Sequence, residues 1–147
     1  MTSLVKITLK NMPEILGKFN SKLECIDLDG DIEKAVLDET VDIMAMIEGE
    51  EVLCLFGLRH QRPGSAEAWV LPGEVLDRYK FTFFKTIYRT IDFVFEKEVI
   101  HRMEMALDSR WKEASKWASK LGFDFEGLAR AYDAHKVDHL IFARIRV

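Results

Sequence analysis

The sequence predicts one α/β domain, and three observations support this prediction. Strand-like and helix-like patterns alternate along the chain in the order β-α-α-β-β-β-α-β-α-β-β. A length of 147 residues with 48% hydrophobic side chains suits one hydrophobic core rather than two. No repeat, low-complexity tract or linker interrupts the pattern. We therefore expect a single domain over residues 1–147.

The first third of the chain predicts one strand followed by two helices. Residues 4–9 alternate between apolar and polar side chains, which is typical of a half-buried strand. Asn11 is placed to cap a helix, and Glu14 follows it at the capping-box spacing. The apolar face of that helix would consist of Ile15, Leu16, Phe19 and Leu23. Residues 31–41 predict a second helix by the same helical spacing of apolar side chains.

The middle of the chain predicts a β-hairpin and a further strand. Two apolar runs, Ile43–Ile47 and Val52–Leu58, are joined by the polar residues 48–51. Residues 59–65 contain Pro and Gly among polar side chains and predict a turn. The segment Glu67–Leu71 then predicts another strand.

Residues 76–98 predict the longest helix. Its apolar stripe consists of Phe84, Ile87, Ile91, Val94 and Phe95. The opposite polar stripe consists of Arg78, Thr82, Lys85 and Arg89. Residues 99–107 return to a strand pattern.

One more helix and two strands complete the predicted order. Asp108 or Ser109 is placed to cap the helix, and Gly122 is the expected left-handed stop. The buried face of the helix would consist of Trp111, Ala114, Trp117 and Leu121. Residues 123–125 and 140–147 alternate as strands do.

Charge and hydropathy argue against two classes of partner. The formal net charge of -4 and the pI near 5.6 do not suit a nucleic-acid binder, because phosphate neutralisation needs a basic surface. No apolar run approaches the roughly 20 residues that a membrane span needs. No signal-peptide pattern is visible, so we expect a cytosolic protein or one packaged into a virion from the cytosol. Cys25 and Cys54 have neither metal-site nor disulfide spacing and predict small buried side chains.

A motif in the last third of the chain resembles a known family. Residues 117–130 contain the pattern LGF-x-x-EG-x-x-R. This resembles the end of the fourth helix and the next strand in GNAT N-acetyltransferases, and residues 138–144 resemble their closing strand. The element order is also that of the family. The resemblance implies a central mixed, mostly antiparallel, twisted sheet of six to seven strands with about four helices. It extends to small divergent GNAT-like proteins of tailed bacteriophages.

The resemblance implies acetyl-CoA as cofactor. In the family, the strand at the position of residues 68–71 diverges from the parallel strand that here would start at Val99. The pantetheine arm pairs with the backbone at that divergence. This assigns cofactor contacts to Ala68, Trp69, Val70 and Leu71. The pyrophosphate lies at the start of the next helix in the family, which adds Arg78, Tyr79 and Lys80.

The expected pyrophosphate loop departs from the family pattern. No glycine follows Gly73 within residues 73–82, whereas the family uses glycines to bring backbone amides onto the phosphates. Glu74 and Asp77 place negative charge in the same segment. Three cations either compensate as side-chain charges or simply form a solvated helix face: Arg78, Lys80 and Lys85.

The proton-transfer residues of the family are only partly matched. Ala118 stands where many members have a tyrosine that protonates the departing thiolate. Glu67, on the diverging strand, is a candidate general base for the amine. His60, in the predicted turn, is a second candidate because imidazole groups exchange protons near neutrality. The alternatives are an ordinary exposed glutamate in a strand and an ordinary histidine in a loop.

No metal site is predicted. A calcium loop over residues 27–38 fails because Ile32 stands where a glycine must make the sharp turn. His135 and His139 have i,i+4 spacing but lie in a predicted loop and at a predicted strand start, so they do not share a helix face.

Two functions therefore remain open. The first is an acetyl-CoA-dependent N-acetyltransferase acting on a small-molecule or protein amine. The second is a non-catalytic GNAT-like binding or structural protein that has lost cofactor binding. In that case the aromatic helix from Tyr79 to Phe95 would serve an interface, either in a homo-oligomer or with a virion partner.

Overall fold

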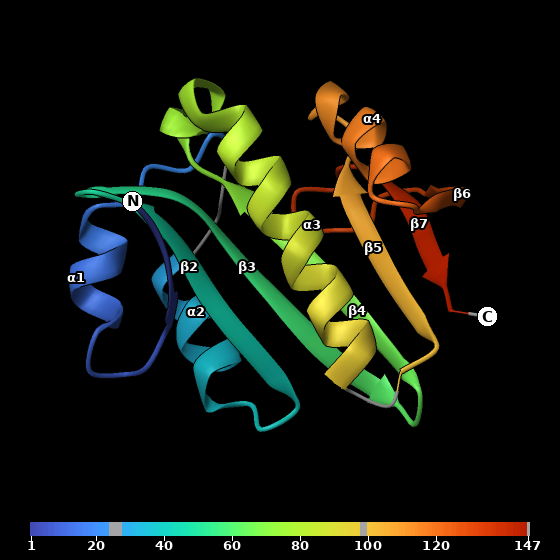
Figure 1. The fold of residues 1–147 in the computed structure, drawn as a ribbon, viewed down its shortest axis with the longest axis horizontal. Coiled ribbons are helices and arrows are strands. Elements are labelled where there is room, and N and C mark those ends of the chain that lie inside the picture. The colour runs from blue at the N-terminus through green and yellow to red at the C-terminus, as the bar shows by residue number, and fades with distance from the viewer. Residues whose placement is uncertain (24–27, 98–99, 147) are drawn as a thin grey trace. The chain divides into compact units, whose positions relative to one another are not determined.

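The computed structural model describes residues 1–23, 28–97 and 100–146, and the predicted order of elements is confirmed (Figure 1). A short 3-10 helix, η1, precedes the longest helix. The elements are β1 (Thr2–Lys6), α1 (Met12–Gly17), α2 (Leu28–Leu37), β2 (Val41–Glu48), β3 (Glu51–Arg62), β4 (Ser65–Pro72), η1 (Glu74–Tyr79), α3 (Lys80–Lys97), β5 (Arg102–Asp108), α4 (Lys112–Lys120), β6 (Asp124–Ala129) and β7 (His139–Ile145).

The strands form a mixed sheet in the order β1-β2-β3-β4-β5-β7-β6. The β1–β2, β2–β3, β5–β7 and β6–β7 pairs are antiparallel, and the β4–β5 pair is parallel. The predicted mostly antiparallel sheet with seven strands is confirmed. No helix among the described residues is long and apolar enough to cross a membrane.

The chain forms two compact units. Unit 1 consists of residues 1–59 and 70–83, and unit 2 consists of residues 60–69 and 84–147. The single domain over residues 1–147 stays a prediction.

Unit 1 is built on the hairpin of β2 and β3. The predicted hairpin is confirmed with a tighter connection, because Glu48 pairs with Glu51 and only two residues form the turn. Gly49 has a φ of 62°, the left-handed conformation that glycine adopts without steric cost. Helix α2 lies against β2 (Figure 1). The buried side chains of unit 1 include Ile15, Phe19, Ile32, Ile43, Ala45, Met46, Leu53, Cys54, Leu55 and Leu76.

Cys54 is fully buried, as predicted, whereas Cys25 lies outside the described residues. Burial raises the pKa of the Cys54 thiol far above its ordinary value, because the thiolate would have to be removed from water. The Cys54 thiol is therefore an unreactive packing group.

The helices of unit 1 are shorter or shifted relative to the prediction, for local reasons. Asn11 is the N-cap residue of α1, as predicted, but its side chain caps no helix N–H group, because its Oδ1 accepts a hydrogen bond from Thr8 N at 2.8 Å. Helix α2 begins before Asp31 and ends at Leu37 rather than Val41. Asp38 Oδ1 accepts hydrogen bonds from Thr40 N and Oγ1 at 2.9 and 2.6 Å, and this turn ends the helix.

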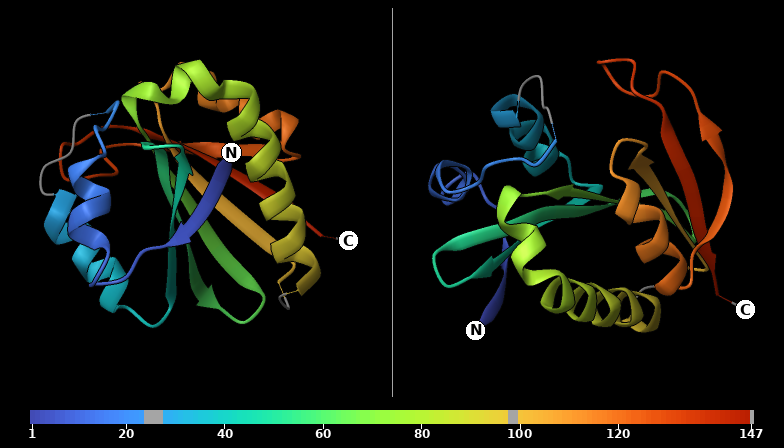
Figure 2. Two further views of the ribbon diagram at one scale, coloured as in Figure 1. Left: turned by 60° about the vertical axis from the view of Figure 1, so that its left-hand side comes forward. Right: turned by 90° about the horizontal axis from the view of Figure 1, so that it is seen from above.

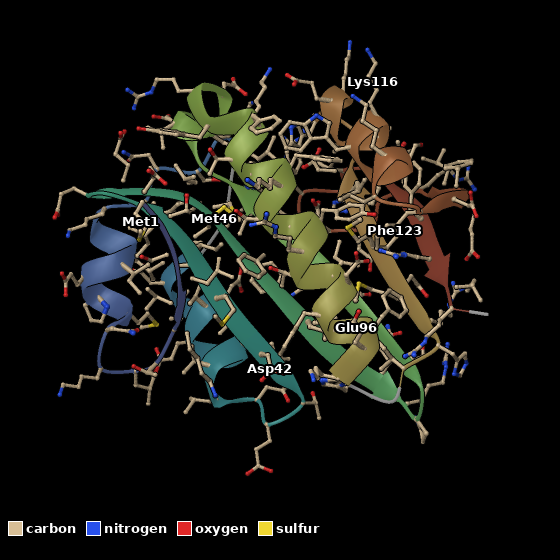
Figure 3. All side chains as sticks on the ribbon, in the orientation of Figure 1. Met1, Asp42, Met46, Glu96, Lys116 and Phe123 are labelled. Atoms are coloured by element: carbon tan, nitrogen blue, oxygen red, sulfur yellow. The ribbon has the colours of Figure 1, made fainter. Side chains whose placement is uncertain are left out.

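Unit 2 packs one face of its strands against helices. The side chains of β5 alternate, and its buried ones are Met103, Met105 and Leu107. Helix α4 lies on one face of β5, β7 and β6 (Figure 2). Phe123 is buried at the end of α4, whereas the side chain of Lys116 extends from α4 into solvent (Figure 3). Gly122, at a φ of 88°, provides the predicted left-handed stop.

Three predicted boundaries in unit 2 are wrong. Strand β3 runs to Arg62, so His60 lies in a strand and the turn is only Pro63-Gly64. Asp108 does not cap α4, because its carboxylate accepts hydrogen bonds from Arg110. Strand β5 begins at Arg102, and the residues predicted just before it, 98 and 99, lie outside the described residues.

Replacing Gly73 with alanine is expected to destabilise the protein. An added Cβ at Gly73 would lie 2.8 Å from Leu53 O and 2.9 Å from Val52 O, so the backbone would have to shift. We expect the free energy of unfolding to fall by about 1–3 kcal/mol, measured by urea denaturation. The matched control is Gly17→Ala, where an added Cβ meets nothing within 4 Å. Equal midpoints for the two variants would contradict this account.

Candidate functional site

The parallel ladder between β4 and β5 is short. Its register joins Ser65–Ala68 to Arg102–Met105, although both strands continue beyond these residues. Beyond the ladder, residues 106–108 of β5 remain paired with β7 on their other side. The β4–β5 register therefore ends at the Ala68–Met105 pair, and the divergence of the two strands that the resemblance implies stays a prediction.

Glu67 lies one residue before the end of this ladder. Its register partner across β4–β5 is Glu104. Glu67 Oε2 accepts hydrogen bonds from Gln61 Nε2 and from Tyr132 Oη, each at 3.4 Å. Glu104 instead accepts a hydrogen bond from Arg102 at 3.1 Å. Among the described residues, Glu67 thus has only neutral partners, whereas its neighbour Glu104 is paired with a cation.

A histidine and an aspartate lie next to Tyr132. The Tyr132 and His139 rings are 4.7 Å apart between centroids, at an interplanar angle of 37°. His139 Nε2 lies 3.1 Å from Asp133 Oδ2. Asp108 is the register partner of His139. We call Glu67, Glu104, Asp108, Tyr132, Asp133 and His139 the polar cluster.

The register places the strand residues of the polar cluster on one face of the sheet. Glu104 and Asp108 alternate with the buried Met103, Met105 and Leu107, so they point to the opposite face of β5. Glu67 and His139 lie beside them on that same face, because directly paired residues share a face. The four strand residues of the polar cluster therefore occupy the face opposite the buried side chains of β5.

The connection between β6 and β7, residues 130–138, is held by its own aspartates. Asp133 Oδ1 accepts hydrogen bonds from the backbone N–H groups of His135 and Val137, both at 3.0 Å. Asp138 Oδ1 accepts one from Ala131 N at 2.8 Å. These bonds fix the loop that carries Tyr132.

The two aspartates beside His139 are stabilised in their charged forms. Burial acts to raise the pKa of Asp133, but hydrogen bonds from Val137 N, His139 and His135 N outweigh it and lower the pKa. Burial likewise opposes ionisation of Asp108, and hydrogen bonds and charge from Arg110 lower its pKa.

Asp108, Asp133 and His139 could also offer ligands to a metal ion. One ligand atom from each lies within 4.8 Å of the others. The Asp108 carboxylate already forms hydrogen bonds to Arg110 Nη2 and Nε at 2.7 and 3.0 Å, which neutralise its charge. His135 is in the loop and His139 opens β7, as predicted. The absence of a metal site stays a prediction.

The two predicted general bases lie on β3 and β4, the two strands that the Pro63-Gly64 turn joins. Glu67 is half-buried in β4 and His60 is half-buried in β3. The hydrogen bonds of Glu67 go to Gln61 and Tyr132, not to His60. Both assignments as general base stay predictions.

The predicted cofactor contacts divide between the two units. Ala68 and Trp69 belong to unit 2, where the β4–β5 ladder ends. The remaining predicted contacts belong to unit 1: Val70, Leu71, Arg78, Tyr79 and Lys80. All these assignments stay predictions.

Carboxylates within unit 1 already contact the cations expected at the pyrophosphate. Arg78 forms an ion pair with Glu51, and Tyr79 Oη donates a hydrogen bond to Glu51 Oε1 at 3.0 Å. This hydrogen bond raises the pKa of Tyr79. Lys80 Nζ lies 4.0 Å from Asp77 Oδ1. An arriving phosphate would compete with these carboxylates.

Sequence analysis missed Tyr132, Asp133 and Gln61. Residues 130–138 have no periodic pattern, and the Tyr132–Glu67 contact joins positions 65 residues apart. The Asp133 spacing to His135 and Val137 is a local turn signal that could have marked an ordered loop.

The arrangement of the elements is that of the GNAT acetyltransferase fold, which confirms the predicted fold class. Solved structures with this fold cover nearly the whole chain. Spermidine N-acetyltransferase from Vibrio cholerae in complex with CoA and spermine has a TM-score of 0.71 at 15% identity, covering 99% of this chain and 95% of that chain. A mutant form of the spermidine/spermine N-acetyltransferase SpeG from Vibrio cholerae has a TM-score of 0.73 at 15% identity, covering 99% and 95%.

The same SpeG enzyme in complex with manganese ions has a TM-score of 0.72 at 15% identity, covering 98% of this chain and 92% of that chain. No protein-family model matches the sequence, and a search of curated proteins gives no significant match. At these identities the likeness shows the fold. The resemblance to phage proteins stays a prediction.

Neutralising Asp133 by mutation is expected to destabilise the protein only at pH values at which the wild-type carboxyl group is charged. The pKa of Asp133 in the folded protein lies below its ordinary value in the unfolded chain. The charged carboxylate therefore contributes its full stabilisation at pH values above the ordinary pKa. This stabilisation is lost as the pH falls through the folded-state pKa. We expect Asp133→Asn to lower the free energy of unfolding by about 1 kcal/mol at about pH 7 and by much less at about pH 3. The measurement is urea denaturation at both pH values.

The control for this comparison is Asp124→Asn, which changes an exposed aspartate of β6 in the same unit. Its effect is expected to be small at both pH values. A cost for Asp133→Asn that is the same at both pH values would show that the charge on Asp133 is not what stabilises the loop.

Proposed function

We propose that this protein is an acetyl-CoA-dependent N-acetyltransferase whose acceptor is a small cationic amine. The observation that carries the proposal is the end of the parallel β4–β5 ladder at Ala68, one residue after Glu67, within a fold shared with acetyltransferases. A carboxylate at this point would act as the base for an amine bound beside the end of the ladder.

The end of the ladder fits the middle part of such a cofactor. Backbone amides and carbonyls beyond a strand ladder can pair with an extended ligand as with an added strand, which suits the pantetheine arm. In unit 2 the backbone of Ala68 and Trp69 would supply these groups. When bound, acetyl-CoA would provide the activated thioester that the amine attacks.

The start of α3 fits the phosphate end of the cofactor less well. The expected cations Arg78 and Lys80 have carboxylate neighbours in unit 1, and the segment lacks the glycines that would present backbone amides. We therefore propose that phosphate contacts are made by side-chain charges alone and that cofactor affinity is modest.

Glu67 is the proposed general base. An ammonium group must lose a proton before its nitrogen can attack a carbonyl, and a carboxylate without a cationic partner is free to accept that proton. Glu67 meets this condition, since its hydrogen-bond donors are neutral.

The acceptor class is proposed from charge. Glu67, Glu104, Asp108 and Asp133 bring four carboxylates to one face and its loop, which would favour a positively charged substrate. Spermidine and spermine, the substrates named for the structural neighbours, are suitable probes of this class.

The alternative is a GNAT-fold binding or structural protein that has lost its cofactor. The contacts of Glu51 with Arg78 and Tyr79 favour it, because they occupy the groups expected to hold the pyrophosphate. Absence of any heat on titration with acetyl-CoA would support this alternative.

The activity is tested with acetyl-CoA and a panel containing spermidine, spermine and a lysine peptide. We expect amine-dependent release of the CoA thiol, with the acetylated amine identified by mass spectrometry. Glu67→Gln is expected to lower kcat about a hundredfold, because the amide cannot accept the proton. The matched control is Glu96→Gln on α3, an exposed residue (Figure 3). Full activity in Glu67→Gln would exclude Glu67 as the base.

Removing the charge of Glu51 is expected to strengthen cofactor binding. Glu51→Gln would release the Arg78 guanidinium from its ion pair and leave it available to a phosphate. We expect the Kd for acetyl-CoA to fall about threefold to tenfold by isothermal titration calorimetry, an effect that added salt should reduce. Glu50→Gln, at the neighbouring position in the hairpin, is the control. An unchanged Kd would mean that Arg78 does not contact the cofactor.

A further inference from the structure

Tyr132 reaches Glu67 from a distant part of the sequence. Its hydroxyl donates to Glu67 Oε2 at 3.4 Å across a separation of 65 residues. Gln61 Nε2 donates to the same oxygen at 3.4 Å. No described residue donates a hydrogen bond to Glu67 Oε1. Two neutral donors therefore hold one oxygen of the carboxylate and leave the other available.

The Tyr132 side chain is held in place by contacts of its ring and its loop. The Tyr132 ring lies against the ring of His139, and His139 is in turn held by Asp133. Tyr132 N also donates to Val137 O at 2.9 Å, which closes the loop on itself. Asp133 and Asp138 bind further backbone N–H groups of this loop. A hydroxyl supported in this way is pre-organised rather than free to rotate through solvent.

Resting on the function proposed above, we propose that Tyr132 is a positioning residue for Glu67. Together with Gln61 it fixes the rotation of the carboxylate, so that Oε1 faces the incoming amine at the end of the β4–β5 ladder. Both hydrogen bonds are long, and such bonds often shorten only when the substrate is bound. The loop of residues 130–138 would thus complete the site that β4 begins.

The proton follows a simple path in this arrangement. The N–H bond of the ammonium group breaks, its electron pair stays on nitrogen, and the proton forms an O–H bond with Glu67 Oε1. The resulting carboxylic acid returns the proton to water before the next turnover. The O–H bond of Tyr132 stays intact throughout. Tyr132 therefore acts through Glu67 and not on the substrate.

The proposal is first tested without turnover. We would compare the carboxyl ¹³C chemical shift of Glu67 at fixed pH in the wild type, Tyr132→Phe and Tyr88→Phe. Tyr132→Phe keeps the ring on His139 and removes only the hydroxyl. Tyr88 on α3 is a matched control, since it is 42% exposed and Tyr132 is 46% exposed. We expect the Glu67 signal to move in Tyr132→Phe and to stay unchanged in Tyr88→Phe. A Glu67 signal that is the same in all three proteins would overturn the proposal.

Kinetics then separate positioning from general stability. We expect Tyr132→Phe to lower kcat about tenfold with little change in KM for acetyl-CoA, because the base is misplaced but the cofactor contacts remain. The double variant Tyr132→Phe/Glu67→Gln should be no slower than Glu67→Gln alone, because the hydroxyl has no carboxylate left to position. Losses that multiply in the double variant would show that Tyr132 does not act through Glu67.

The outcomes distinguish this proposal from the function on which it rests. A shifted Glu67 signal in a protein that acetylates no amine would contradict the acetyltransferase function while upholding the Tyr132–Glu67 contact. Acetylation by the wild type with equal kcat in Tyr132→Phe would uphold the function and refute the positioning role.

Discussion

The short parallel ladder between β4 and β5 is the constraint on which the candidate site depends. Parallel neighbours cannot be joined by a tight turn, so the chain must leave the sheet and return. Here η1 and α3 supply that crossover, after which β5 starts beside the beginning of β4. The two strands are paired only at their first residues, and the pairing ends at Ala68 and Met105. Glu67, on the last pair but one, is thereby held by the ladder yet lies next to its end.

Charge is distributed unevenly across the polar cluster, and this decides which carboxylate is available for chemistry. Glu104 is balanced by Arg102, and Asp108 by Arg110, while Asp133 is held by His139 and backbone N–H groups. These three carboxylates therefore already have charged or backbone hydrogen-bond donors. Glu67 has neutral donors on one oxygen only. A substrate cation would therefore meet the least competition at Glu67, even though the other carboxylates also attract it.

The element order and the hairpin could be predicted from the sequence, because they depend on local periodicity. The parallel pairing of β4 with β5 was predicted from the family resemblance, which rests on a motif that spans few residues. It placed His60 in a turn, since nothing local indicates that β3 continues to Arg62. Glu67 was proposed as a base because the resemblance places it on the diverging strand. Tyr132 could not be predicted, because its proposed role arises from a contact between distant segments, and its own loop has no periodic pattern. Long-range side-chain contacts are the part of a site that local patterns do not encode.

The predicted cofactor contacts of unit 1 pose two different physical problems. The Arg78–Glu51 pair is substantially exposed, and solvent screens such pairs, so a phosphate could displace Glu51 at little cost. The missing glycines are the more serious departure. Backbone amides supply several hydrogen bonds at fixed geometry without ordering any side chain, whereas Arg78 and Lys80 must each be immobilised to bind. Weak cofactor binding would thus follow more from the backbone of residues 73–82 than from the charge of Glu51. Replacing charged side chains on the surface would therefore not restore the full affinity for the cofactor.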